Sequence, residues 1–169
     1  MELKTNVKEY CGNKTDDVKI IKDYWSKRAY SYSQQNRTEL ECYKHNVWRN
    51  IILNNSPKKD VLKVLDIGCG PGEFSIIMAE EGHDVTGVDI TEEMLQQASE
   101  NARNYNVKLN LKCMDVHNLE FEDNTFDLII SRNVTWNLKN PDQFFKECQR
   151  VLKEDGRMIY FDANWYTFI

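Results

Sequence analysis

Apolar residues in the first sixty positions recur at steps of three and four, which is the spacing of one face of an amphipathic helix. One such face comprises Val18, Ile21, Trp25, Arg28, Ala29 and Tyr32, and a second comprises Leu40, Tyr43, Val47, Trp48 and Ile51. We therefore expect two helices, with Asp16 or Asp17 capping the start of the first. The polar residues 1–15 are expected to be mobile.

After residue 60 the pattern changes to short apolar runs that alternate with amphipathic segments. The apolar runs predict five strands, at residues 61–67, 84–90, 108–114, 126–131 and 157–161. Three helices are predicted between them: one from Phe74 to near Gly82, one capped by Thr91, and one opened by Pro141. The inward residues of the last two helices are expected to be Met94, Leu95, Ala98 and Ala102, and then Phe144, Phe145, Cys148, Val151 and Leu152. Gly156 is expected to end the turn that leaves the last helix.

Strands separated by helices indicate βαβ units and a parallel sheet. The predicted fold class is therefore α/β, a Rossmann-like parallel sheet with helices on both faces, preceded by an N-terminal helical segment. A polar stretch at residues 54–60 separates the helical pattern before it from the alternating strand and helix pattern after it. We expect residues 1–60 to form a helical cap or lead-in and residues 61–169 to form the ligand-binding domain.

Composition narrows the classes of protein that remain. The chain has 169 residues, 41% of them hydrophobic and 29% charged, which suits one globular domain with a sizeable core. No apolar run approaches the roughly 20 residues that a membrane-spanning helix needs. The polar start lacks an apolar signal segment, so we expect a cytoplasmic location. The net charge of −5 argues against a protein whose main function is to bind nucleic acid through its phosphates.

The cysteines and histidines show neither a disulfide framework nor a metal-binding pattern. The five cysteines contain no CxxC pair and are odd in number, so we expect reduced and mostly buried thiols. The three histidines, His45, His83 and His117, lack helical HxxxH spacing. We therefore expect no metal site.

A glycine-rich turn follows the first predicted strand, in the segment Asp66–Gly72. Gly68, Gly70 and Gly72 let the backbone turn sharply and lie against a ligand with no Cβ in the way, although a GxG alone is explained equally well as an ordinary turn. In the dinucleotide fingerprint G-x-G-x-x-G, a third glycine would stand where this chain has Glu73. A carboxylate there would repel a pyrophosphate at the helix N-terminus, which disfavours a nicotinamide- or flavin-dependent oxidoreductase.

Acidic residues follow the next two predicted strands. Asp89 ends the second strand and can accept two hydrogen bonds from a ribose diol, the alternative being a surface acid that caps the next helix. Asp115 follows the third strand, and with the backbone N–H of Val116 it can contact an adenine edge, although alone it is better explained as a loop aspartate. Because ligands of parallel sheets lie beyond the carboxyl ends of the strands, the acids and the glycine turn together favour a nucleoside site.

Four segments in this order and spacing, VLDIGCGPGEFS, VTGVDI, CMDV and FDLIISRNVTWNL, resemble the class I S-adenosylmethionine-dependent methyltransferases. The resemblance covers about residues 61–169 and points to enzymes of the ubiquinone and menaquinone biosynthesis type. The segment YWSKRAYSYS at 24–33 also looks like the lead-in helix of small-molecule methyltransferases. The implied cofactor is S-adenosyl-L-methionine, with S-adenosyl-L-homocysteine as product.

The resemblance implies roles for the positions that match the family motifs. Asp66 and the turn through Gly68, Cys69, Gly70 and Gly72 would hold the methionine half of the cofactor. Asp89 would hold both ribose hydroxyls. The adenine would be contacted by Ile90, Met94, Asp115 and Val116.

Further positions would surround the reacting methyl group and the acceptor. After the fourth strand these are Ser131, Arg132 and Asn133, and on the N-terminal helix they are Tyr24, Trp25 and Tyr32. Methyl transfer from a sulfonium is an in-line displacement that needs mainly alignment, so a general base is required only if the acceptor must lose a proton. The catalytic residue therefore stays unknown, with His117, Asn133 and Tyr32 as candidates.

The acceptor is expected to be a small molecule. The turn after the fourth strand reads Ser131-Arg132-Asn133-Val134 rather than the N/D-P-P-Y type of enzymes that methylate amino groups of bases or glutamine. No Pro-Cys pair of the cytosine-C5 type is present. The alternative is a chain that binds S-adenosylmethionine without turnover.

The family's sheet normally continues past the fifth strand, whereas this sequence stops at Ile169. We therefore expect a chain truncated after that strand, lacking the C-terminal strands of the usual fold. Residues 158–161 would then form an uncovered apolar edge, through which we expect self-association or coverage by the tail.

Overall fold

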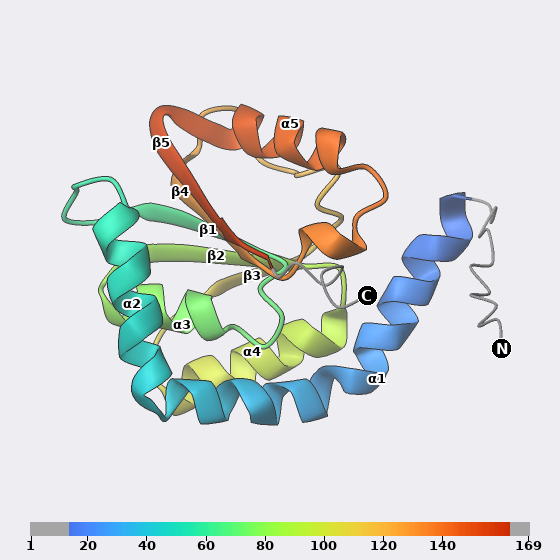
Figure 1. Cartoon of the computed structure of the whole chain (residues 1–169), viewed down its shortest axis with the longest axis horizontal. Helices are drawn as coiled ribbons and strands as arrows, with labels where there is room; N and C mark the ends of the chain where they lie inside the picture. The colour runs from blue at the N-terminus through green and yellow to red at the C-terminus, as the bar shows by residue number, and fades with distance from the viewer. Residues whose placement is uncertain (1–13, 163–169) are drawn as a thin grey trace, which may run out of the picture.

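Five strands form one sheet in the order β3-β2-β1-β4-β5 (Figure 1). The computed structural model describes residues 14–162. Its strands are β1 (Lys63–Ile67), β2 (Asp84–Asp89), β3 (Asn110–Cys113), β4 (Phe126–Arg132) and β5 (Leu152–Phe161). All four strand pairs are parallel. The predicted α/β fold with a Rossmann-like parallel sheet is confirmed.

Helices cover both faces of the sheet (Figure 1). One side carries α1 (Lys14–Leu40), α2 (Tyr43–Asn55), α3 (Glu73–Glu80) and α4 (Glu92–Asn104), and the other carries α5 (Pro141–Val151). A 3-10 turn, η1 (Thr135–Asn137), follows β4. The amino-terminal half of α1 passes the carboxyl ends of the strands, where the sequence predicts a ligand site.

Polar contacts fix α1 and α2 onto the rest of the chain. Arg37 Nε donates to Asn101 Oδ1 at 2.7 Å, and Asn101 Nδ2 donates to Ser33 Oγ at 3.2 Å. Arg49 forms an ion pair with Glu81 just beyond α3. The helical lead-in therefore packs on α3 and α4, while its status as a separate unit ending at residue 60 stays a prediction.

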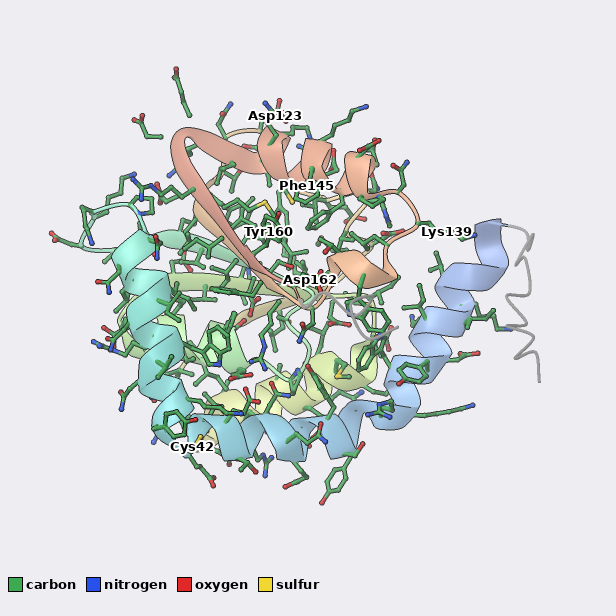
Figure 2. All side chains as sticks on the ribbon, viewed as in Figure 1. Cys42, Asp123, Lys139, Phe145, Tyr160 and Asp162 are labelled. Carbon is green, nitrogen blue, oxygen red and sulfur yellow. The ribbon has the colours of Figure 1, made fainter. Side chains whose placement is uncertain are left out.

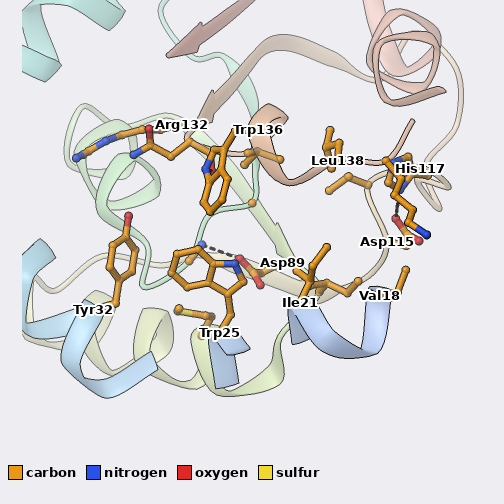
Figure 3. A pocket seen from close by; sticks show the side chains of 18 residues that line it. Val18, Ile21, Trp25, Tyr32, Asp89, Asp115, His117, Arg132, Trp136 and Leu138 are labelled. Carbon is orange, nitrogen blue, oxygen red and sulfur yellow. Dashed lines mark hydrogen bonds and ion pairs between the residues drawn. The ribbon is translucent and has the colours of Figure 1, made fainter. Parts of the chain in front are cut away.

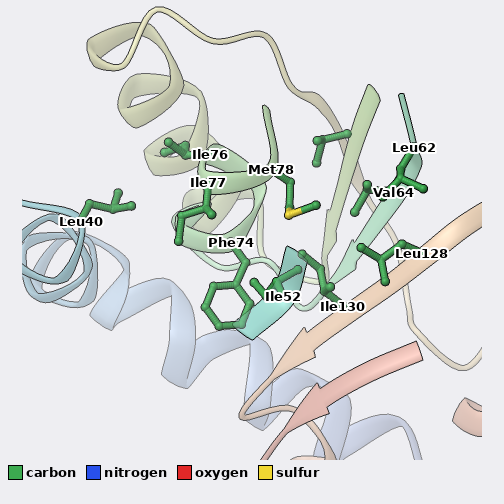
Figure 4. Close-up of a cluster of buried hydrophobic side chains, with 11 residues drawn as sticks. Leu40, Ile52, Leu62, Val64, Phe74, Ile76, Ile77, Met78, Leu128 and Ile130 are labelled. Atoms are coloured by element: carbon green, nitrogen blue, oxygen red, sulfur yellow. The ribbon is translucent and has the colours of Figure 1, made fainter. Parts of the chain in front are cut away.

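Two hydrophobic clusters fill the layers on either face of the sheet. On β1, Val64 faces the α2 and α3 side, whereas Leu65 and Ile67 face α5. The first cluster includes Ile52, Phe74, Ile77, Met78, Leu128 and Ile130 (Figure 4). The second includes Phe126, Ile129, Phe144, Cys148 and Val151. Because both faces of the central strands are buried, these strands are nearly continuous apolar runs, which made them recognisable in the sequence.

A buried carboxylate joins several segments at the end of the sheet opposite the carboxyl ends. Asp127 accepts from Lys59 Nζ at 2.5 Å, from the backbone N–H of Lys63 at 2.9 Å and from Lys153 Nζ at 3.0 Å. Burial opposes ionisation, but these hydrogen bonds and charges outweigh it and lower the pKa of Asp127 to about 2. One side chain of β4 thus holds the segment before β1, the start of β1 and the start of β5.

The amino-terminal helix begins earlier than the sequence predicted. Since α1 starts at Lys14, Asp16 and Asp17 lie inside its first turn and not at the N-cap. Leu40 ends α1 and does not belong to α2, whose N-cap is Cys42. Residues 14 and 15 of the polar start are helical, and the expectation for residues 1–13 lies outside the described residues. Thr91 stands at the N-cap of α4 as predicted, but its side chain makes no capping hydrogen bond.

The junction between α5 and β5 also differs from the prediction. Leu152 begins β5 and pairs with Phe126, so it is not part of the helix. Gly156 lies within β5 at a shift of register, and a Cβ there would come within 2.7 Å of Leu152 Cδ1. Phe145 is not inward but 38% exposed, and its ring lies 5.8 Å from that of Tyr160 (Figure 2). The chain therefore passes from α5 into β5 without an intervening loop, and Gly156 packs against Leu152.

Strand β5 is an edge of the sheet that residues 14–162 form. Within residues 14–162 it pairs with β4 alone, and Tyr160 is 54% exposed. The predicted association through this edge stays a prediction. None of the helices in the described part of the chain is long and apolar enough to cross a membrane.

Candidate functional site

The turn after β1 has a backbone that favours glycine. Gly68 and Gly70 have φ angles of +66° and +52°, in the left-handed region. A Cβ on Gly68 would overlap Val134 Cγ2, and one on Gly70 would project towards Tyr32 Cε1 at 3.7 Å. The turn is held to β2 because Cys69 N donates to Val88 O at 2.9 Å. The glycines therefore leave an open space between the turn and α1.

Asp89, at the end of β2, is a buried carboxylate anchored by backbone groups. Its Oδ2 accepts from Gly70 N at 3.0 Å and its Oδ1 from Thr91 N at 2.9 Å. Burial raises the pKa of Asp89, and the hydrogen bonds from Thr91 and Gly70 oppose that rise. Each carboxylate oxygen has a second lone pair, so both remain able to accept from a ligand.

Asp66 lies behind the turn and faces α3. It is buried, and its Oδ2 accepts from Ser75 Oγ at 2.6 Å. Burial raises the pKa of Asp66 to about 7 although the hydrogen bonds from Ser75 lower it. Asp66 and Cys69 line a small second cavity beside the turn, and burial raises the pKa of the Cys69 thiol well above its usual range.

The main cavity has a volume of about 330 Å³ and lies between α1, the glycine turn and the loops after β2, β3 and β4 (Figure 3). Its walls are mostly apolar. In Figure 3, Trp25 and Trp136 enter the space from opposite sides near Asp89, while Asp115 and His117 lie at one end. The Trp25 and Tyr32 rings contact each other, with centroids 5.4 Å apart. A cavity of this size and character suits a small organic ligand.

At that end of the cavity, Asp115 and His117 bond to each other. Asp115 Oδ1 lies 2.7 Å from His117 Nδ1 and 2.9 Å from His117 N. His117 Nε2 is buried and has no hydrogen-bond partner among the described residues. The pair belongs to the cavity wall, so His117 is not merely a solvated loop residue.

Arg132 ends β4 and connects α1, α3 and the sheet. Its Nη1 lies 2.5 Å from Glu73 Oε2, and its Nη2 lies 2.9 Å from Glu39 Oε2. The guanidinium also lies over the rings of Trp48 and Phe74, 5.1 and 5.4 Å from their centroids. This network closes the cavity on the side opposite Asp115.

The two carboxyl groups on Arg132 titrate differently. Burial, reinforced by the charge of Glu39, raises the pKa of Glu73 to about 8, although Arg132 opposes the rise. Burial works against ionisation of Glu39 too, but Arg132 and Lys44 lower the pKa of Glu39 overall. Burial thus favours the protonated form of Glu73, whereas Arg132 and Lys44 favour the ionised form of Glu39.

Most of the predicted site residues meet at the main cavity. Those that line it are Trp25, Tyr32, Gly68, Gly70, Asp89, Ile90, Met94, Asp115, Val116, His117, Arg132 and Asn133. Asp66 and Cys69 line the small second cavity instead.

Three predicted site residues line neither cavity. Tyr24 is half exposed on the outer side of α1, where its ring packs on Trp25. Gly72 lies against Ala98 of α4. The hydroxyl of Ser131 is buried and donates to Ile67 O at 3.1 Å.

The sequence analysis missed six lining residues. They are Val18, Ile21, Val134, Trp136, Leu138 and Lys139. Val18 and Ile21 were assigned to an ordinary packing face, and the segment after β4 has no periodicity that could have marked it. No cluster of three or more metal-ligating side chains occurs in the part of the chain that the structure describes.

A parallel sheet with a glycine turn after β1 and a buried acid after β2, both facing one cavity, is the arrangement of the class I methyltransferase fold. The family described as "Methyltransferase domain" matches residues 65–160. The chain belongs to this family, and the predicted resemblance is confirmed.

Curated relatives include enzymes of quinone biosynthesis. The chain is 30% identical over 112 residues to a ubiquinone biosynthesis O-methyltransferase of Coxiella burnetii, covering 63% of this chain and 48% of that protein. It is 33% identical over 129 residues to a demethylmenaquinone methyltransferase of Staphylococcus haemolyticus, covering 73% of this chain and 52% of that protein. The chain thus spans about half the length of these relatives.

Solved structures agree on the fold. A protein of Methanococcus maripaludis, provisionally described as an S-adenosyl-L-methionine-dependent methyltransferase, is 27% identical with a TM-score of 0.74, covering 80% of this chain and 62% of that chain. A phosphoethanolamine N-methyltransferase of Haemonchus contortus, solved with S-adenosyl-L-methionine, is 32% identical with a TM-score of 0.61, covering 67% of this chain and 27% of that chain.

Proposed function

We propose that this chain binds S-adenosyl-L-methionine in the main cavity and transfers its methyl group to a small-molecule acceptor. The observation that carries the proposal is Asp89. It is a buried carboxylate at the end of β2, oriented by two backbone N–H groups and facing the cavity beside the glycine turn.

The residues present fit the cofactor. The free lone pairs of Asp89 can accept from two neighbouring ribose hydroxyls. Ile90 and Met94 supply apolar surface for the adenine, and the loop at Asp115 and Val116 supplies polar groups for its edge. At Gly70 a Cβ would enter the space towards Tyr32 that the methionine half requires. When bound, the cofactor supplies a methyl group already activated by the positive sulfonium.

The chain's own contribution to the reaction is enclosure and alignment. Trp25, Tyr32 and Trp136 surround the centre of the cavity with aromatic faces, which exclude water and attract a cation. Holding donor and acceptor in line supplies most of what such a displacement needs. Tyr32, His117 and Asn133 remain candidates for receiving a proton from the acceptor, because all three line the cavity.

The nature of the acceptor is also a proposal. The walls of the cavity are mostly apolar, which favours a small organic acceptor. By their names, one curated relative is an O-methyltransferase of ubiquinone biosynthesis and another is a demethylmenaquinone methyltransferase. The net charge of −5 disfavours nucleic acid.

The first test is calorimetric titration of the chain with S-adenosyl-L-methionine and S-adenosyl-L-homocysteine. Wild type should bind both in the micromolar range, and Asp89→Ala should lose at least about a hundredfold in affinity, because two hydroxyl contacts to a charged group disappear. Asp84→Ala, at the exposed start of the same strand, is the matched control and should bind like wild type. A folded wild type that binds neither ligand would refute the proposal.

Binding of S-adenosyl-L-methionine without turnover is the alternative. Formation of S-adenosyl-L-homocysteine with a panel of phenolic, quinol and amine acceptors separates the two. Product formed with any acceptor and lost in Asp89→Ala supports the enzyme. Tight cofactor binding with no product across the panel supports the binding module.

A further inference from the structure

The two halves of α1 differ in how deeply their side chains are buried. Within residues 18–28 every side chain is half-buried or exposed. In the second half, buried side chains recur at steps of three and four residues, and they are Ala29, Ser33, Asn36 and Leu40. One continuous helix therefore has a second half that packs into the protein and a first half that does not.

Polar contacts hold the second half of α1 as well. Arg37 Nε donates to Asn101 Oδ1 at 2.7 Å. Asn101 Nδ2 in turn donates to Ser33 Oγ at 3.2 Å and to Pro71 O at 2.9 Å, so this half is joined to both α4 and the glycine turn. Leu40 belongs to the hydrophobic cluster beneath α2 and α3. Opening of this half would expose buried apolar and polar groups together.

The first half of α1 instead lies across the main cavity. Val18, Ile21 and Trp25 line that cavity and point into it (Figure 3). Val18 is nevertheless 36% exposed. An exposed hydrogen bond joins this half to α4, in which Ser26 Oγ donates to Glu93 Oε2 at 2.8 Å. A helix end opens easily because its first N–H groups lack partners within the helix, and shallow packing with exposed hydrogen bonds lowers the local stability further.

We propose that residues 18–28 of α1 form a lid over the main cavity, which opens in the free protein and closes on a ligand, and that Ser26 and Glu93 form its latch. The inference rests on the proposed function for the identity of the ligand and goes beyond it in assigning a motion to one half of a helix. A ligand in the cavity would contact Val18, Ile21 and Trp25 and so add to the packing of this half. Closure of such a lid shields the cavity from water.

The test is hydrogen exchange of the backbone amides, measured by mass spectrometry with and without S-adenosyl-L-homocysteine. In the free protein, amides of residues 18–28 should exchange at least about tenfold faster than those of residues 33–40. At about a hundred times its Kd, the ligand should slow exchange of residues 18–28 at least about tenfold, because a ligand bound only under the closed lid suppresses opening. Fraying of a helix end that the ligand does not contact would not respond.

Matched variants test the latch. Ser26→Ala and Glu93→Ala each remove the hydrogen bond between α1 and α4. Each should speed exchange of residues 18–28 in the free protein about threefold and should speed dissociation of the ligand by a similar factor. Glu92→Ala is the control, because it also removes an acid from the first turn of α4 but leaves the bond between Ser26 and Glu93 in place. It should behave like wild type in both measurements.

The outcomes separate this inference from the proposed function. If calorimetry shows binding but residues 18–28 exchange as slowly as residues 33–40 in the free protein, or exchange equally fast with and without ligand, the lid is overturned and the proposed function stands. Ser26→Ala and Glu93→Ala variants that match Glu92→Ala overturn the latch. Absence of binding by folded wild type refutes the proposed function and, with it, closure on this ligand. Circular dichroism establishes folding of each variant.

Discussion

Replacing Glu73 with glutamine tests the electrostatics beneath the cavity. Burial raises the pKa of Glu73 from its ordinary 4.5 to about 8. Between these values the folded protein holds a proton that the unfolded chain has released, so the free energy of unfolding falls as the pH rises. One proton corresponds to about 1.4 kcal/mol per pH unit, or about 2.7 kcal/mol between pH 5.5 and 7.5. Glutamine does not titrate and resembles the protonated acid in shape, so Glu73→Gln removes this loss.

The assay is urea unfolding of both proteins at pH 5.5, 6.5 and 7.5, followed by tryptophan fluorescence. The stability of Glu73→Gln relative to wild type should rise by about 2.7 kcal/mol across the series. Glu39 does not disturb the comparison: its pKa is lowered, so its contribution is present above the unfolded pKa and is lost only at lower pH. The raised pKa of Asp66 adds a slope to both proteins, which cancels in the difference.

Glu81→Gln is the matched control for this series. Glu81 also pairs with an arginine, Arg49, but the hydrogen bond from Arg49 lowers the pKa of Glu81. It is therefore ionised in both states above pH 5.5, so the effect of its replacement should vary with pH only through its interaction with the neighbouring His45 and His83. A stability difference for Glu73→Gln that varies with pH no more than that of this control would show that Glu73 is ionised in the folded protein and would refute the reasoning.

Two other predictions concern the core and the edge of the sheet. Phe144→Ala should cost about 3–5 kcal/mol in urea unfolding because the ring is fully buried under α5, whereas Phe145→Ala, 38% exposed, should cost less than about 1 kcal/mol. Because β5 has no second partner strand within residues 14–162 and Tyr160 is exposed, the chain should associate with rising concentration in sedimentation velocity, and Tyr160→Lys should weaken the association. Sedimentation of wild type as a monomer at every concentration would contradict the second prediction.

The sheet was predictable because its central strands are buried on both faces. Residues 64–67 and 126–131 are apolar runs with few polar interruptions, and a glycine turn follows the first of them. The order of these signals predicted a ligand site at the carboxyl ends of the strands. Boundaries were less predictable where tertiary contacts decide them: Leu152 pairs with Phe126 in the sheet, although its spacing continues the apolar face of α5.

The far wall of the cavity could not be predicted from spacing. Ile21 and Trp25 share a helical face that is typical of core packing, and only the position of α1 across the strand ends turns that face into cavity lining. Trp136 lies in the short turn η1, where no periodicity marks a direction. In the sequence, Glu73 was interpreted only as a negative charge that would repel a pyrophosphate. Its partner in the structure, Arg132, is 59 residues away in the sequence. Such long-range pairs have no local signature.

The hydrogen bonds and ion pairs of Asp127 hold the sheet together at the end that does not carry the cavity. They tie the starts of β1 and β5 to β4 at the end remote from the cavity. Strand register at that end is thus secured by residues outside the loops that face the cavity. Those loops can change in sequence while the starts of β1, β4 and β5 keep their alignment. In this protein, the loops at the cavity end of the sheet can vary because charged hydrogen bonds hold the strands in place at the opposite end.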